Sequence, residues 1–133
     1  MPRSTSASVD VLYVDDDVHW LETVATCLER EQERLAVQSE TSAQVALEAM
    51  RTAPVDVVLS DYEMSEVNGL DFLEHVRVAH PDIPFIPYTG RGSEAVASDA
   101  VARGVTEYVQ KGSGRVHVAE LATRILTTVD TTE

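Results

Sequence analysis

With 133 residues, the chain is the size of one domain and is long enough to bury a hydrophobic core. It has 23 Asp and Glu against 10 Lys and Arg, and this net charge of −13 argues against direct binding to nucleic acid. No apolar run approaches the roughly 20 residues that span a bilayer. The N-terminal residues lack the apolar core of a signal peptide, so we expect a cytoplasmic protein without membrane insertion.

The acidic excess also predicts a dependence on salt. Repulsion among like charges weakens a compact state unless ions screen it, and halophilic proteins operate in that regime. Lys111 is the only lysine among the 10 basic residues. Acidic excess with almost no lysine is typical of a salt-loving organism. The single cysteine, Cys27, is predicted to be a small buried hydrophobe on a helix.

The apolar pattern alternates between short strand-like runs and helical spacings. Strands are predicted at Val9–Val14, Leu35–Ser39, Val55–Ser60, Ile83–Tyr88 and Val105–Gln110. Helices are predicted from Val18 to about Arg34, over Ala43–Met50 with a stop at Pro54, from Gly69 to near Pro81, over Ser93–Arg103 and over Val116–Val129. Residues 1–8 and 130–133 are expected to be free tails. Five such units predict an α/β fold, a doubly wound parallel sheet with helices on both faces.

The spacing of the first helix predicts which of its side chains face the core. Val18, Leu21, Ala25 and Leu28 recur at helical intervals and are expected to point inward. Asp17, directly before this helix, is interpreted as its N-cap rather than as part of a binding site.

Charged side chains follow three of the predicted strands. Asp15 and Asp16 follow the first strand, Asp61 follows the third and Lys111 follows the fifth. Because the carboxyl ends of parallel strands meet at one edge of a sheet, we expect these groups to share a crevice. Asp61 is a candidate nucleophile that would form an aspartyl phosphate. Asp15, Asp16 and Asp61 offer the hard oxygen ligands that suit Mg²⁺.

The fourth predicted strand ends in residues that suit a phosphoryl group. The hydroxyl of Thr89 is placed to bond a phosphoryl oxygen, Gly90 leaves space for the group, and Lys111 supplies a compensating positive charge. Phosphoryl transfer requires mainly positioning and charge neutralisation of this kind. The four histidines are scattered without the spacing of metal ligands.

The chain resembles a response-regulator receiver domain of two-component signalling over residues 9–129. The matching motifs are Asp56-Val57-Val58-Leu59-Ser60-Asp61-Tyr62-Glu63-Met64 with Asn68-Gly69, Val14-Asp15-Asp16-Asp17, Tyr88-Thr89-Gly90 and Tyr108-Val109-Gln110-Lys111. They occur in the family's order and spacing. The resemblance implies a flavodoxin-like sheet with strand order 2-1-3-4-5, and the salt-adapted composition suggests a halophilic archaeon.

The resemblance also implies a role for each motif residue. Asp61 would be the phosphoacceptor, and Asp15 and Asp16 would hold Mg²⁺ together with Asp61 and the backbone carbonyl of Glu63. Lys111 would contact the phosphate.

Other roles follow from the same resemblance. Thr89 and Tyr108 would form the switch pair, and Glu63, Gly90 and Arg91 would modulate loss of the phosphoryl group. Two positions depart from the family, which usually has proline where this chain has Ser65 and Gly112. A cis bond before a residue other than proline costs about 3 kcal/mol, so the geometry at Lys111-Gly112 is left open.

The expected function is that of a stand-alone receiver, or of one module in a longer kinase or regulator. It would take a phosphoryl group from a sensor histidine kinase or a phosphotransfer protein and catalyse only its own phosphorylation and dephosphorylation. Output would pass to a downstream protein, or to a phosphorylation-dependent homodimer, through the surface at 93–129. Two alternatives stay open: an unphosphorylated docking module, and a Mg²⁺-dependent phosphatase of the haloacid-dehalogenase class.

Overall fold

The protein folds around one five-stranded parallel sheet. The computed structural model describes residues 8–61, 69–89, 109–110 and 114–132. The strand order is β2-β1-β3-β4-β5, and every neighbouring pair is parallel. The strands are β1 (Val9–Val14), β2 (Leu35–Glu40), β3 (Val57–Ser60), β4 (Phe85–Thr89) and β5 (Val109–Gln110). The predicted fold class and strand order are confirmed.

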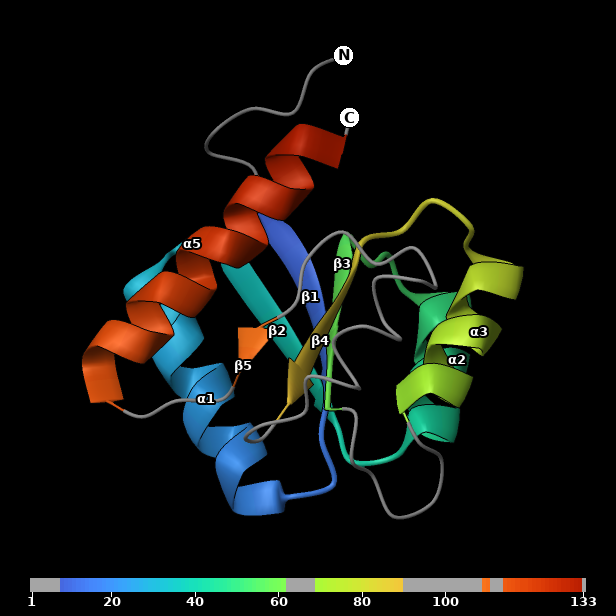
Figure 1. The fold of residues 1–133 in the computed structure, drawn as a ribbon, viewed down its shortest axis with the longest axis horizontal. Helices are drawn as coiled ribbons and strands as arrows, with labels where there is room; N and C mark the ends of the chain where they lie inside the picture. The colour runs from blue at the N-terminus through green and yellow to red at the C-terminus, as the bar shows by residue number, and fades with distance from the viewer. Residues whose placement is uncertain (1–7, 62–68, 90–108, 111–113, 133) are drawn as a thin grey trace.

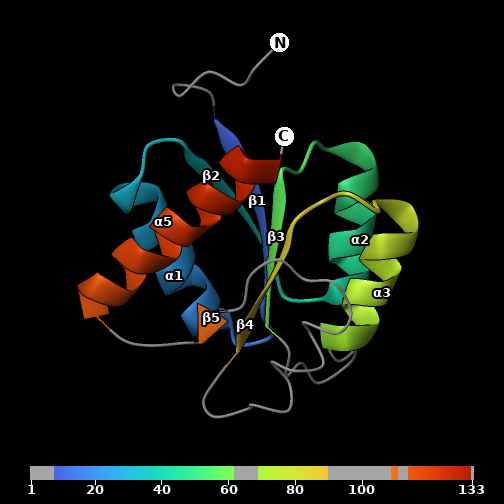
Figure 2. The same ribbon diagram turned by 45° about the horizontal axis from the view of Figure 1, so that its top comes forward.

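Helices cover both faces of the sheet, as Figures 1 and 2 show. One face carries α1 (Val18–Glu31) and α5 (Gly114–Thr132), and the other carries α2 (Ala43–Thr52) and α3 (Gly69–Ala79). The helix predicted at Ser93–Arg103 and the first part of the predicted fifth strand lie outside the described residues. None of the helices in the described part of the chain has the length and apolar character needed to cross a bilayer.

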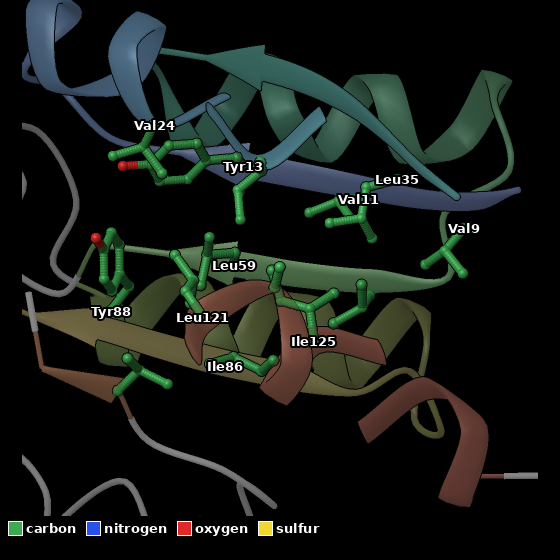
Figure 3. Close-up of a cluster of buried hydrophobic side chains, with 14 of the residues drawn as sticks. Val9, Val11, Tyr13, Val24, Leu35, Leu59, Ile86, Tyr88, Leu121 and Ile125 are labelled. Carbon is green, nitrogen blue, oxygen red and sulfur yellow. The ribbon is translucent and has the colours of Figure 1, made fainter. Parts of the chain in front are cut away.

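Two hydrophobic clusters fill the space between the sheet and its helices. Neighbouring residues of β1 illustrate the division, because Tyr13 packs in the cluster under α1 and α5, whereas Leu12 packs in the cluster under α2 and α3. Side chains alternate between the two faces along a strand, and both faces are covered here. Figure 3 shows the first cluster, in which Ile125 of α5 lies close to the strand residues. This two-sided burial explains why β1 and β3 appear as nearly continuous apolar runs.

Several element boundaries differ from the predicted ones. Helix α1 ends at Glu31 rather than near Arg34, because Gln32 is already extended and the chain enters β2 at Leu35. Strand β3 begins at Val57 instead of Val55, and β4 begins at Phe85 instead of Ile83. In the case of β4, Pro84 lies just before the strand and its carbonyl accepts the N–H of Val58.

The core-facing side of α1 matches the predicted one at Leu21, Ala25 and Leu28 but not at Val18. Val18 is 47% exposed, whereas Val24 is buried together with Leu21 and Leu28. Cys27 is only partly buried, so its prediction as a core residue was wrong. Val18 is the first residue of the helix.

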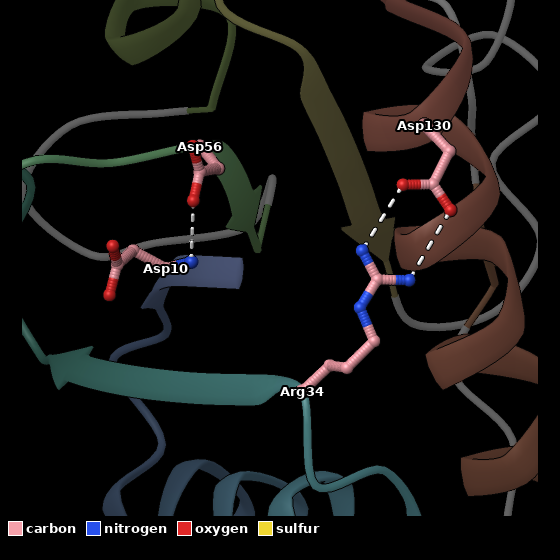
Figure 4. A network of polar contacts seen from close by, with 4 residues as sticks. All are labelled: Asp10, Arg34, Asp56 and Asp130. Atoms are coloured by element: carbon pink, nitrogen blue, oxygen red, sulfur yellow. Dashed lines mark hydrogen bonds and ion pairs between the residues drawn. The ribbon is translucent and has the colours of Figure 1, made fainter. Parts of the chain in front are cut away.

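Helix α5 continues to Thr132, so residues 130–132 are helical and do not form the predicted tail. Asp130 in its last turn forms an ion pair of 3.3 Å with Arg34, which lies just before β2. Nearby, the Asp56 carboxylate accepts the Asp10 N–H at 2.8 Å (Figure 4). These contacts lie at the amino ends of the strands, opposite the predicted site.

Candidate functional site

Two acidic residues lie side by side because β1 and β3 are neighbours that end in register. Val14 pairs with Ser60, so Asp15 and Asp61 follow at the same level of the sheet. The Asp61 N–H donates to the Val14 carbonyl at 2.9 Å, and the Asp15 N–H donates to the Glu40 carbonyl at 3.1 Å. These backbone bonds continue the sheet one residue beyond the strands and fix the backbone positions of Asp15 and Asp61.

Asp16 joins the two buried residues in a compact group of carboxylates. Asp15, Asp16 and Asp61 each present an oxygen, and these oxygens all lie within 4.8 Å of one another. Asp15 is fully buried and Asp61 is 4% exposed, and acidic side chains are seldom buried to this extent. Three hard oxygen donors in such a small volume fit a divalent cation of the Mg²⁺ type. The structure therefore brings together the three carboxylates that the sequence predicted would meet.

The Asp15 carboxylate is held by hydrogen bonds to both of its oxygens. The Tyr13 hydroxyl donates to one oxygen at 3.2 Å, and the Asp17 N–H donates to the other at 3.0 Å. Burial raises the pKa of Tyr13 well above its usual value, so the phenol keeps its proton and remains a donor. With both oxygens held, the orientation of Asp15 does not depend on a bound ion.

Asp17 belongs to helix α1 rather than to the acidic group. Its side chain accepts the Trp20 N–H at 3.1 Å, which confirms the predicted N-cap. The helix thus begins beside the carboxylates, and the positive end of its dipole stabilises negative charge there.

Of the other predicted site residues, the structure describes only Thr89. Thr89 is the last residue of β4 and pairs with Gln110, so the ends of β4 and β5 meet at the same edge of the sheet. The described part of β5 stops one residue before Lys111. Glu63, Gly90, Arg91, Tyr108 and Lys111 lie outside the described residues, as do Ser65 and Gly112.

Sequence reasoning missed two polar contacts of buried tyrosines near the site. One is the bond from Tyr13 to Asp15, for which residue spacing gave a signal: positions two apart on a strand share a face. The other joins the Tyr88 hydroxyl to Nε2 of His117 at 2.6 Å. His117 is one of four scattered histidines, and no local pattern connects it with a strand residue 29 positions away.

Comparison with known proteins identifies the family. The family model "Response regulator receiver domain" matches residues 11–125. The chain belongs to the response-regulator receiver family. It is therefore a receiver domain of two-component signalling, a class of phosphoacceptor domains.

Individual relatives agree with this assignment. Transcriptional regulatory protein ZraR of Klebsiella oxytoca is 31% identical over 103 residues, which cover 77% of this receiver and 23% of ZraR. Photosynthetic apparatus regulatory protein RegA of Cereibacter sphaeroides is 32% identical over 105 residues, which cover 79% of the receiver and 56% of RegA. The receiver thus spans about a quarter to a half of the length of these relatives.

A solved structure shows the same fold. The crystal structure of a CheY-like response regulator receiver domain protein from Methanospirillum hungatei superposes with a TM-score of 0.83 at 22% identity. The match covers 95% of this receiver and 97% of that chain.

Proposed function

We propose that this receiver, over residues 9–129, accepts a phosphoryl group on Asp61 in a Mg²⁺-dependent reaction. The donor would be a phosphohistidine of a sensor histidine kinase or of a phosphotransfer protein. The observation that carries the proposal is the placement of buried Asp61 in one group with Asp15 and Asp16. Membership of the family supports the same assignment.

The acidic group fits the metal that this reaction requires. Asp15, Asp16 and Asp61 would hold Mg²⁺ through their carboxylate oxygens, and the family resemblance adds the backbone carbonyl of Glu63. Mg²⁺ usually binds through one or two carboxylates, several waters and phosphate oxygens, so this oxygen-only set is suitable. When bound, the cation neutralises charge at the reacting phosphate.

The chain's own residues would position the transfer. A carboxylate oxygen of Asp61 forms a bond to phosphorus while the bond from phosphorus to the donor nitrogen breaks, and the histidine keeps that electron pair. Backbone bonds hold Asp61 beside Asp15 for this attack. Lys111 and Thr89 would contact the phosphoryl oxygens as a cation and a hydroxyl donor.

The aspartyl phosphate would then shift an equilibrium between two conformations of the domain. Thr89 and Tyr108 would act as the switch pair, and the surface at 93–129 would bind a downstream protein or a second copy of the chain. Glu63, Gly90 and Arg91 would set how fast water removes the phosphoryl group.

Intact-mass measurement after incubation with Mg²⁺ and a small acyl phosphate tests the proposal. The wild-type protein should gain one phosphoryl group, and Asp61→Asn should gain none because the nucleophile is removed while the shape is kept. Asp71→Asn, which removes an exposed acid from α3, is the matched control and should label like wild type. A chelator should abolish labelling.

Other outcomes identify the alternatives. An adduct on Asp61→Asn would overturn the assignment of the phosphoacceptor. Release of phosphate without any adduct would indicate the phosphatase, and neither adduct nor turnover would indicate an unphosphorylated docking module.

A further inference from the structure

A row of buried aromatic side chains connects the acidic group with helix α5. Tyr13, which donates to Asp15, lies edge-on to Tyr88 with ring centroids 6.0 Å apart. Both tyrosines are fully buried. In Figure 3 their hydroxyl groups lie at the same end of the cluster, far from Val9 and therefore toward the carboxyl ends of the strands.

At the other end of the row, Tyr88 of β4 is tied to His117 of α5. The Tyr88 hydroxyl lies 2.6 Å from Nε2 of His117, and the two rings are stacked with centroids 5.7 Å apart and planes 8° from parallel. Packing alone would not require a polar atom on each ring at this distance. The contact is thus a hydrogen bond between the carboxyl end of β4 and the first part of α5.

The protonation states of the two rings are compatible with the Tyr88 hydroxyl as the donor of this bond. Burial raises the pKa of Tyr88, so its phenol carries the proton at neutral pH. Burial lowers the pKa of His117, so its imidazole is neutral. In these states the phenol can donate to an unprotonated Nε2, and this arrangement, on which the proposal below is built, places the imidazole proton on Nδ1. An isolated imidazole is free to exchange between its two tautomers, whereas this bond selects one.

We propose that His117 is a positioning residue of the receiver. By accepting the hydrogen bond of Tyr88, it links the end of β4 to α5, so that the conformational change caused by phosphorylation of Asp61 also moves that helix. Thr89, the proposed switch residue, directly follows Tyr88 in β4. A shift of the backbone at Thr89 therefore also displaces Tyr88. Since Tyr88 is bonded to His117, the displacement reaches α5 without passing through solvent-exposed side chains. This inference rests on the proposed phosphorylation of Asp61.

Nuclear magnetic resonance on labelled protein, before and after phosphorylation, tests the proposal. The nitrogen shifts of His117 should show the proton on Nδ1 in wild type, and this tautomer preference should be lost in Tyr88→Phe. Phosphorylation should shift the amide signals along α5 in wild type. Tyr88→Phe and His117→Phe should still be labelled at Asp61 but should lose most of the α5 response.

Two further variants separate positioning from general packing. In His117→Gln the side-chain carbonyl can accept the Tyr88 hydroxyl, so we expect the α5 response to be restored. His75→Phe changes an exposed histidine on α3 and should behave as wild type. If His117→Phe fails to fold, Tyr88→Phe, which keeps its ring, decides the result.

The outcomes distinguish this inference from the function on which it depends. An unchanged α5 response in phosphorylated Tyr88→Phe, or a His117 proton found on Nε2 in wild type, overturns the role of His117 alone. Absence of a phosphoryl adduct on the wild-type protein, checked by mass on the same samples, overturns the proposed function and this inference together.

Discussion

The carboxylate oxygens of Asp15, Asp16 and Asp61 lie within 4.8 Å of one another, so the arrangement that suits a cation also brings like charges together. Without a cation, their mutual repulsion destabilises the folded state, and burial of Asp15 and Asp61 limits how well water can screen it. The hydrogen bonds from Tyr13 and Asp17 hold Asp15 in place despite this repulsion. The site is therefore prepared for a cation before one binds, and a bound cation should stabilise the whole domain.

Removing one charge from this group should stabilise the metal-free protein. Asp16 is the most exposed of the three carboxylates, and Asp16→Asn should raise the free energy of unfolding by at least about 1 kcal/mol, the repulsion between two unit charges about 4 Å apart in water. The same variant should gain less stability from Mg²⁺ than wild type does. Urea unfolding with and without Mg²⁺ measures both effects. Asp71→Asn carries the same change in net charge on α3, and an equal response in both variants would contradict a local origin.

His117 should make stability depend on pH in a defined direction. Burial lowers its pKa below the usual 6.5, so the unfolded chain takes up a proton at a higher pH than the folded one does. The contribution of His117 to stability is therefore complete above pH 6.5 and is lost as the pH falls through and below that value. Urea unfolding over this range, at constant high salt, should show a steeper loss for wild type than for His117→Gln. Equal slopes would contradict the prediction.

At the scale of the elements, the N-cap of α1 fixes the end of the segment Asp15-Asp16-Asp17, which joins β1 to this helix. Asp17 ends the loop and caps the helix by accepting the Trp20 N–H. Asp17→Ala and Asp17→Asn both remove a negative charge, but only alanine removes the acceptor. We expect Asp17→Ala to be about 1 kcal/mol less stable than Asp17→Asn. Thermal unfolding of the pair measures the cap alone, and equal midpoints would show that the cap contributes little.

The sheet was predictable from sequence mainly because β1 and β3 are buried apolar runs that each end at an acidic residue. The order of elements and the meeting of Asp15, Asp16 and Asp61 at one edge followed from that pattern. The inward side of α1 was predicted correctly at Leu21 and Leu28 but not at Val18, which fits the same helical spacing and is 47% exposed.

Contacts between distant elements left no such pattern in the sequence. The bond between Tyr88 and His117 joins a strand to a helix that is adjacent only in the folded protein. A tyrosine in an apolar strand indicates packing, and a single histidine at the start of a helix indicates nothing specific. The ion pair between Arg34 and Asp130 was missed for the same reason, since its partners are 96 residues apart.

At the scale of the whole molecule, opposite edges of the sheet differ in their contacts. The carboxyl edge gathers the like charges of Asp15, Asp16 and Asp61, and the amino edge carries the Arg34–Asp130 ion pair in the last turn of α5 (Figure 4). An exposed pair of this kind contributes only about 0–1 kcal/mol. Stability therefore depends mainly on the two hydrophobic clusters, against which the net charge of −13 acts over the entire surface.

The whole domain should consequently become more stable as salt is added. Screening shortens the Debye length from about 10 Å at 0.1 M to about 3 Å at 1 M salt, so repulsion between acids weakens throughout this range. We expect the melting temperature to rise continuously with KCl from dilute buffer to molar concentrations. At low KCl, Mg²⁺ at about 100 times its Kd should add about 2.7 kcal/mol through the acidic group, and Asp61→Asn should lose much of that gain. A melting temperature that stays flat in KCl would contradict the dependence on charge, and an equal Mg²⁺ effect in Asp61→Asn would show that Mg²⁺ acts only by screening.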